Sequence, residues 1–217
     1  MNYLPFISTI CFRGNNIFIT NTMANLNEGF EGAFLFLERN SMTQSRNFTI
    51  IESYFSKNLA RNGAILNFES GLKNFSLYFA SNICQENNGF GKKIRFLLIL
   101  NLYKKDGTAI FIKFYCPECT LTLENNVFSF NWGVNGACIF AEYAAGTLKL
   151  IKNIFNENLS SRDDFSMGSS MVLVGSNSSF FESYKDKFIK NSGDLYGDTI
   201  SGCNSKFNET LIAGSFS

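Results

Sequence analysis

The chain has 217 residues, 19 Lys and Arg against 18 Asp and Glu, and a formal net charge of +1. This balance gives no electrostatic reason to expect nucleic acid or an anionic membrane as a partner. The sequence contains no His, which excludes Ser-His-Asp catalysis, Cys-His catalysis and His-based metal sites. The length is enough to bury a sizeable core.

The N-terminal segment from Met1 to Phe12 is apolar, but it lacks a basic n-region and a clear cleavage site. It is therefore a poor match to a secretory signal peptide. Because a secreted protein normally carries one, we expect Met1 to lie inside a longer reading frame. The apolar run Phe96–Leu100 has the length of a strand, so no membrane span is expected.

One short pattern recurs along the chain. The motif Phe-x-x-Asn occurs at Phe12/Asn15, Phe18/Asn21, Phe55/Asn58, Phe79/Asn82, Phe128/Asn131, Phe155/Asn158 and Phe188/Asn191. A Gly-Ala pair or a related pair follows at Gly32-Ala33, Gly63-Ala64, Gly107-Thr108-Ala109, Gly136-Ala137 and Gly197-Asp198-Thr199. Before the Phe, apolar residues alternate with polar ones, as in Leu121-x-Leu123 and Leu148-x-Leu150, and this period of two predicts a strand with one buried face.

The repeated unit is therefore predicted to be a strand, a turn closed around Asn, a second turn at Gly, and another strand. The units recur every 20 to 35 residues or so, which is typical of solenoids. Copies stacked as coils would form parallel hydrogen bonds and one continuous core. Asn at the same corner of successive coils can form a ladder of amide hydrogen bonds, and Gly supplies positive φ. We expect an all-β chain of about six or seven coils.

Phe-x-x-Asn followed by Gly-Ala-Ile resembles the repeats of polymorphic outer-membrane proteins and related protist surface proteins. These belong to the right-handed parallel β-helix, or pectin-lyase-like, superfamily. The resemblance covers residues from about Ile17 to Ile200, and it implies a right-handed parallel β-helix. This chain departs from the usual Gly-Gly-Ala-Ile, because Asn, Glu or Asp replaces the first Gly.

No composition shift marks a domain boundary, so residues 1–217 are expected to form a single repeat domain. The distance from the motif Phe to the Gly is eight residues in the two best copies. It is longer after Phe18 and after Phe155, which predicts inserted loops at Thr22–Glu31 and Leu159–Met167. Insertions of this kind collect on one face of a solenoid, often the binding face. The chain ends at Ser217 without a polar capping unit, which suggests that the protein is longer, is truncated, or pairs its open end with a partner.

Enzymes of the pectin-lyase-like superfamily, which this chain resembles, cleave polysaccharides with clustered Asp. The best carboxylate group in this sequence is Arg162-Asp163-Asp164, in the second expected loop. Two carboxylates can bind calcium or act as acid and base, with Lys152 or Arg162 as the basic partner. Neighbouring residues on a strand point to opposite faces, however, and such pairs are common in loops. We therefore expect no metal site, no cofactor and no catalytic residues. The Asp pair remains the alternative.

Trp132 is the only Trp and follows a motif Asn, so it invites a sugar-stacking role. Its equivalents include Leu59, Ile83 and Leu159, which favours a position facing the core; Thr22 and Ser192 in weaker copies are exceptions.

Cys116-Pro117-Glu118-Cys119 is a C-x-x-C motif that lies between two predicted strands. Redox motifs of this type open a helix, and a zinc site needs a second close pair. We expect a local disulfide or two free thiols. The single residues Cys84, Cys138 and Cys203 are expected to pack as small apolar groups.

Two basic clusters, Lys92-Lys93-x-Arg95 and Lys104-Lys105, could contact anionic glycans, but short clusters of this kind are usually solvated surface. Five Asn-x-Ser/Thr sequons begin at Asn47, Asn74, Asn158, Asn177 and Asn208. They permit secretion without proving it.

These observations predict a non-catalytic β-helical segment of a surface or secreted protein, which acts as a stalk or as an adhesion surface for a glycan or another surface protein. The alternative is a polysaccharide lyase or glycoside hydrolase that uses Asp163 and Asp164.

Overall fold

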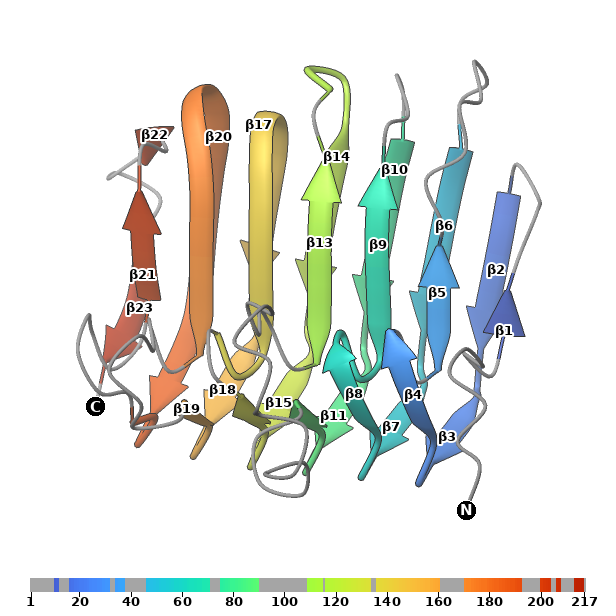
Figure 1. The fold of residues 1–217 in the computed structure, drawn as a ribbon. Coiled ribbons are helices and arrows are strands. Elements are labelled where there is room, and N and C mark those ends of the chain that lie inside the picture. The colour runs from blue at the N-terminus through green and yellow to red at the C-terminus, as the bar shows by residue number, and fades with distance from the viewer. Residues whose placement is uncertain are drawn as a thin grey trace, which may run out of the picture.

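A computed structural model describes residues 10–11, 16–31, 34–37, 46–70, 75–89, 109–114, 116–133, 136–160, 170–192, 200–203, 206–207 and 213–216. Within these ranges the chain is all-β, contains no helix, and pairs its strands only in parallel. The strands stack side by side from the N-terminal to the C-terminal end of the molecule (Figure 1). The predicted parallel solenoid is therefore confirmed. None of the described ranges holds a helix with the length and apolarity that a membrane crossing requires.

Each turn of the solenoid has four sides. Side one consists of β2 (Asn16–Thr20), β6 (Arg46–Ile51), β10 (Phe75–Ala80), β14 (Thr120–Glu124) and parts of β17 (Ile139–Ile151) and β20 (Met171–Ile189). Side two consists of β3 (Met23–Asn25), β7 (Tyr54–Ser56), β11 (Ile83–Gln85), β15 (Val127–Ser129), β18 (Ile154–Asn156) and the end of β20. Side three is a separate sheet of β4 (Glu28–Glu31), β8 (Leu59–Asn62), β12 (Asn88–Gly89), β16 (Trp132–Gly133) and β19 (Leu159–Ser160).

Side four consists of β1 (Ile10–Cys11), β5 (Leu35–Leu37), β9 (Leu66–Ser70), β13 (Ile110–Phe114), the beginnings of β17 and β20, and β21 (Ile200–Cys203). The short strands β22 (Lys206–Phe207) and β23 (Ala213–Phe216) pair with β20. We number the corners by the side that precedes them, so that corner one joins sides one and two.

Three turns have a separate strand on every side, namely β2–β5, β6–β9 and β10–β13, and β14–β17 complete a fourth turn whose last strand runs on into the next level. This is fewer than the expected six or seven coils of one regular form. The levels that follow are built differently, because β17 and β20 each bend over corner four and continue from side four onto side one (Figure 1). Counting copies of a sequence motif does not reveal strands that run through a corner.

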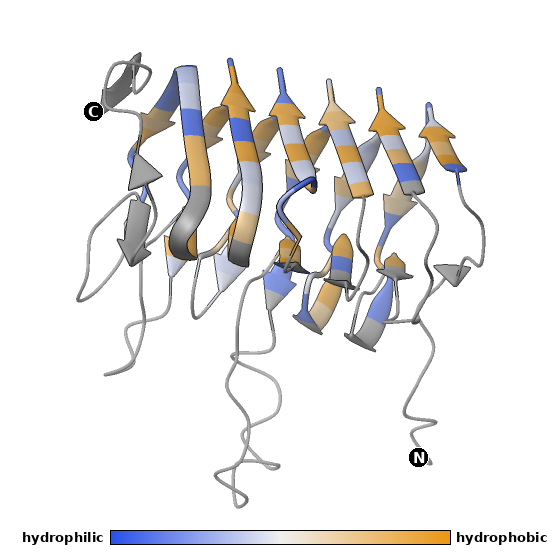
Figure 2. Cartoon of the chain, turned by 90° about the horizontal axis from the view of Figure 1, so that it is seen from above, coloured by the Kyte–Doolittle hydropathy of each residue, from blue (hydrophilic) through white to orange (hydrophobic). Residues whose placement is uncertain are grey.

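The core lies inside the four sides and is filled by every second residue of the long strands. Leu77, Leu121 and Leu148 occupy one column of it, whereas Thr122 and Lys149, one position further along, face outward. Alternating bands of apolar and polar residues mark this pattern along the strands (Figure 2). The strands align in the register that the repeated alternation predicted.

Two corners keep a constant length. Seven positions separate Asn47 on side one from Tyr54 on side two, and five separate Tyr54 from Leu59 on side three. The same intervals recur at each described level through β20. A fixed interval brings the same backbone position to the same corner at every level, which is the condition for side chains to stack there.

Corner three varies in length instead. Seven positions separate Leu59 from Leu66, but twenty-two separate Asn88 from Ile110. The expected insertion at Leu159–Met167 begins at this corner with β19, and residues 161–169 lie outside the described ranges.

The other expected insertion was wrong. Residues 22 to 31 contain two regular strands, β3 and β4. The error comes from Phe18, which was aligned with Phe55 but lies on the outer face of β2 with 66% of its surface exposed. Ala24 occupies the inward position opposite Phe55, and it lies the same eight residues before Gly32 as Phe55 lies before Gly63.

Candidate functional site

Corner two is formed by a continuous ladder of buried amides, which we call the second ladder. Each Asn after the first accepts, on its side-chain oxygen, the backbone N–H and one Nδ2–H of the Asn one level earlier, at 2.8–3.1 Å. The other Nδ2–H of the later residues donates to a backbone carbonyl of the preceding level, at 3.0–3.1 Å. The members are Asn27, Asn58, Asn87, Asn131, Asn158 and Asn191.

The four motif residues Asn58, Asn131, Asn158 and Asn191 therefore lie in one column, as the repeat predicted. Asn27 and Asn87 were missed because Ala24 and Cys84 replace the motif Phe three residues earlier. An interior Asn of the ladder uses both acceptor sites and both donors, so its side chain has no capacity left to bind a ligand.

Corner one holds a second column of the same kind, the first ladder, which the motif search did not separate. Its members are Ser53, Asn82, Asn126, Asn153 and Asp186, each five positions before a member of the second ladder. The motif predicts the same corner for Asn82 as for Asn58, but Phe79 belongs to side one and Asn82 to corner one. Phe12 and Asn15 lie outside the described residues.

The residue immediately before each ladder position has a left-handed backbone, with φ between 48° and 58°. Its N–H donates to a carbonyl of the next level, as from Lys57 to Gln85 at 3.1 Å. The following N–H, that of Asn58, donates to the side-chain oxygen of Asn87. The left-handed residue is thus the one before the ladder position and not the ladder Asn itself. Asn supplies the acceptor that makes the conformation possible for Lys, Glu and even Phe130.

The motif Phe residues form the core beneath the second ladder. Phe128, Phe155 and Phe188 stack with nearly parallel rings, at centroid distances of 5.0 and 4.8 Å. Between Phe55 and Phe128 the column holds Cys84, and Phe79 from side one fills the gap, at 6.0 Å from Phe55 and 6.4 Å from Phe128.

Gly63 and Gly136 lie at corner three with φ of 59° and 60°. A Cβ atom at these positions would collide with the carbonyl oxygens of Leu66 and Ile139. The Ala that follows each Gly is fully buried. Glycine is therefore required here by backbone contact as well as by φ.

Asp186 is a buried carboxylate at the end of the described first ladder. One of its oxygens accepts the backbone N–H and the Nδ2–H of Asn153, at 2.7 and 2.8 Å. The other accepts the Ser183 hydroxyl at 2.7 Å and the Tyr184 N–H at 3.2 Å. Burial raises the pKa of Asp186 above 3.8, against the opposing effect of these donors.

Trp132 does not face the core. It lies half-buried on the outer face of side three, where it pairs with Asn88 and with Leu159, which is 39% exposed. The inward prediction was wrong because the strands of side three begin with the outward residue. The inward position is the next one, occupied at this level by Gly133.

Cys116 and Cys119 form a disulfide at the turn between β13 and β14, with their Cα atoms 5.3 Å apart. Of the two cases left open for this motif, the structure shows the disulfide. Cys84 and Cys138 are buried free thiols, as expected, and burial raises the pKa of both well above the usual value for a thiol. The side chain of Cys203 lies outside the described part.

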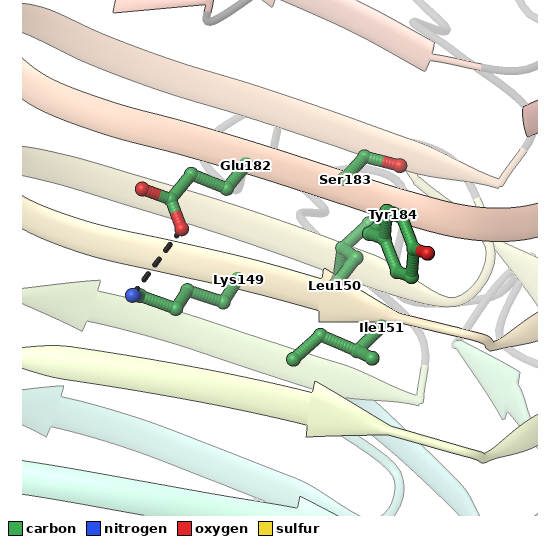
Figure 3. A pocket seen from close by; sticks show the side chains of 6 residues that line it. All are labelled: Lys149, Leu150, Ile151, Glu182, Ser183 and Tyr184. Carbon is green, nitrogen blue, oxygen red and sulfur yellow. Dashed lines mark ion pairs between the residues drawn. The ribbon is translucent and has the colours of Figure 1, made fainter. Parts of the chain in front are cut away.

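A shallow hollow of about 210 Å³ lies on side one between β17 and β20. Lys149 and Glu182 extend side by side there, with Nζ and Oε2 3.2 Å apart, while Tyr184 projects further along β20 (Figure 3). The lining includes one carboxylate, and this carboxylate is paired with the lysine. Paired-carboxylate chemistry needs a second acid at a defined distance, and the lining of this hollow offers a single carboxylate.

Arg162, Asp163 and Asp164 lie outside the described residues, as do the basic clusters at 92–95 and 104–105. The structure therefore does not test the alternative catalytic group. Within the described ranges no three acidic or sulfur-bearing side chains gather into a group that could hold a metal ion.

Comparison of the chain with protein-family models, with curated proteins and with solved structures finds no match. The parallel β-solenoid is thus established by its own geometry, and the pectin-lyase-like assignment stays a prediction.

Proposed function

We propose that the chain is a non-catalytic β-helical segment of a surface or secreted protein, which acts as a rigid stalk and presents an outer face for adhesion. The observation that carries this proposal is the pair of ladders. From the level of β2 to that of β20 they bond each level to the next through side chains at two corners, in addition to the parallel backbone hydrogen bonds. Buried and fully satisfied polar networks of this kind make a structure rigid.

The Cys116–Cys119 disulfide supports an extracellular location, because disulfides persist in oxidising compartments. The right-handed, pectin-lyase-like classification belongs to the same proposal. It is supported by the Phe-x-x-Asn and Gly-Ala repeats, and an experimental structure that gives the opposite hand would refute it.

The hollow on side one supports adhesion to a glycan. Tyr184 offers an aromatic ring that is 42% exposed, next to an ion pair that can exchange hydrogen bonds with sugar hydroxyls. Exposed aromatic rings beside polar groups are suited to binding surfaces that are apolar on one side and hydrated on the other. Another surface protein is the second class of partner.

The location is tested by labelling intact cells of the source organism with a membrane-impermeant biotin reagent. The full-length protein that contains this chain should be labelled without permeabilisation. Labelling that requires permeabilisation would refute the surface location.

Adhesion is tested by probing an array of acidic and neutral glycans with the purified chain, with Tyr184→Ala, and with Tyr54→Ala on side two as the matched control. Binding should fall about three- to tenfold in Tyr184→Ala alone. Equal losses in both variants, or binding to no glycan, would refute the glycan proposal.

The lyase or hydrolase alternative depends on Arg162, Asp163 and Asp164, and no observation in the described residues favours it. The same glycans should remain uncleaved by the wild-type chain. Cleavage that disappears in Asp163→Ala would replace the proposal with the alternative.

A further inference from the structure

The structure describes the acceptor side chain of two of the five sequons, and these two differ in exposure. Asn47 lies on the outer face of β6 with its side chain exposed, and Thr49, two positions later, lies on the same face. Asn158 is buried in the second ladder, where its Nδ2 donates both hydrogens, to the carbonyl of Phe128 at 3.0 Å and to Asn191 at 2.9 Å.

We propose that Asn47 is an N-glycosylation site of this protein and that Asn158 is not modified in the folded chain. The inference rests on the proposed function in one respect: the chain must enter a secretory route. The oligosaccharide donor is a polyprenyl pyrophosphate-linked glycan, and the Asn-x-Thr sequence is what the transferase recognises.

The chemistry is compatible with the contacts of Asn47. Nδ2 forms a bond to the anomeric carbon of the donor, and the bond from that carbon to the pyrophosphate oxygen breaks. The lipid pyrophosphate leaves with the electron pair, and one amide proton passes to a base of the transferase. The product keeps one N–H, which can still donate to Asn16 Oδ1, now 3.3 Å from Nδ2.

The same reaction at Asn158 would remove one of the two hydrogens that the ladder uses, and it would place a sugar inside the closed corner. An unsatisfied buried carbonyl or amide oxygen destabilises the fold, before any clash is counted. Chains modified at Asn158 are therefore expected to fail to complete the solenoid and to be missing from the folded, secreted fraction.

Glycosylation at Asn47 also has a consequence for the outer face of side one. Asn47 lies at the second level of this side, whereas the hollow beside Tyr184 lies between the two levels formed by β17 and β20. A glycan at Asn47 would shield the early levels of side one and leave the later ones accessible to a partner.

The test is to express the chain behind an added signal peptide in eukaryotic secretory cells and to isolate the protease-resistant, secreted protein. Each sequon is then mapped by mass spectrometry after enzymatic deglycosylation in ¹⁸O water, which marks every former glycan site as ¹⁸O-labelled Asp. Thr49→Ala destroys the Asn47 sequon without touching its acceptor, and Thr49→Ser preserves the sequon. Ser160→Ala is the matched control, since it destroys the Asn158 sequon at a buried hydroxyl that has no hydrogen-bond partner.

We expect the label at Asn47 in wild type, Thr49→Ser and Ser160→Ala, and the loss of one glycan per chain in Thr49→Ala. We expect no label at Asn158 in any of them. An unlabelled Asn47 in the wild-type protein, or a labelled Asn158 in the folded fraction, would overturn the inference. If Asn47 is labelled in this experiment but the native protein never enters a secretory route, the proposed location fails and the inference fails with it, whereas an unlabelled Asn47 overturns the inference alone.

Discussion

The backbone N–H and the side-chain Nδ2 of Asn153 both donate to the same carboxylate oxygen of Asp186, at 2.7 and 2.8 Å. Asp186 thus occupies a position that holds Asn at the three preceding levels. The inward residue three positions before the ladder residue changes as well. It is Leu150 at the level of Asn153 and Ser183 at the level of Asp186. The pair Ser183–Asp186 thus replaces the pair Leu150–Asn153. Where Asn has an Nδ2 that donates, Asp186 has an oxygen that must accept, and the Ser183 hydroxyl donates to it.

Because the pKa of Asp186 is raised in the folded chain, folding favours its protonated form. Its contribution to stability is therefore fully present below the unfolded pKa of about 3.8 and is lost as the pH rises through the folded value. The free energy of unfolding of wild type, relative to Asp186→Asn, should increase as the pH is lowered from 7. Each tenfold difference in proton affinity corresponds to about 1.4 kcal/mol.

Urea denaturation at a series of pH values measures this difference. Glu157→Gln, which removes an exposed carboxyl, serves as the control. If the free energy of unfolding of wild type, relative to Asp186→Asn, decreases as the pH is lowered, the four hydrogen-bond donors outweigh burial in setting the pKa of Asp186.

Removing one ladder amide should destabilise the fold far more than removing an exposed one. Asn158→Ala leaves the N–H and one of the two Nδ2 hydrogens of Asn131, and the carbonyl of Phe128, without their partners. We expect a loss of about 3 kcal/mol or more in the free energy of unfolding. Asn156→Ala, on the outer side of β18, should change it by less than about 0.5 kcal/mol. Equal effects in thermal denaturation would show that the ladder contributes little.

At Gly136 the obstacle to a side chain is the carbonyl of Ile139 as well as the positive φ. Gly136→Ala and Gly136→Asn should therefore both destabilise the chain, by about 2 kcal/mol or more. Asn tolerates the left-handed region better than Ala does, so φ alone would make it the milder change. Calorimetry that finds Gly136→Asn close to wild type would show that the backbone can move away.

Restoring the motif Phe at position 84 should destabilise the fold. Cys84 stands where four other levels have Phe, but the ring of Phe79 already fills the space between Phe55 and Phe128. Cys84→Phe should lower the free energy of unfolding by about 1–3 kcal/mol through overpacking. The smaller change Cys84→Val is the control. A higher melting temperature for Cys84→Phe would mean that Phe79 can give way.

The stacked solenoid could be predicted because its signal is repetitive. Alternation before the motif Phe specifies the inward face, and Gly63 and Gly136 mark the same corner at the same distance from it. The first ladder could also have been found, since Asn82/Asn87, Asn126/Asn131 and Asn153/Asn158 are all pairs five residues apart. The Phe-x-x-Asn motif does not show this pattern, because Leu or Ile, and not Phe, stands three residues before most of the first-ladder positions.

The position of Trp132 could not be predicted in the same way. Phe-x-x-Asn specifies a corner but does not tell which way the next residue points. At corner one the residue after the ladder position, such as Ile83, faces outward, and at corner two Trp132 does the same. Apolar character in a solenoid with short strands is therefore a weaker guide to burial than it is in a long sheet, where alternation can be followed over many residues.

The contrast between fixed and variable corners constrains how such a chain can change over generations. One residue gained or lost between Ser53 and Asn58 would shift the second ladder relative to the first and leave an amide unmatched on both neighbouring levels. An equal change between Asn62 and Leu66 would leave both ladders in place. Natural variation, and the grafting of foreign peptides by protein engineers, should therefore be confined to corners three and four.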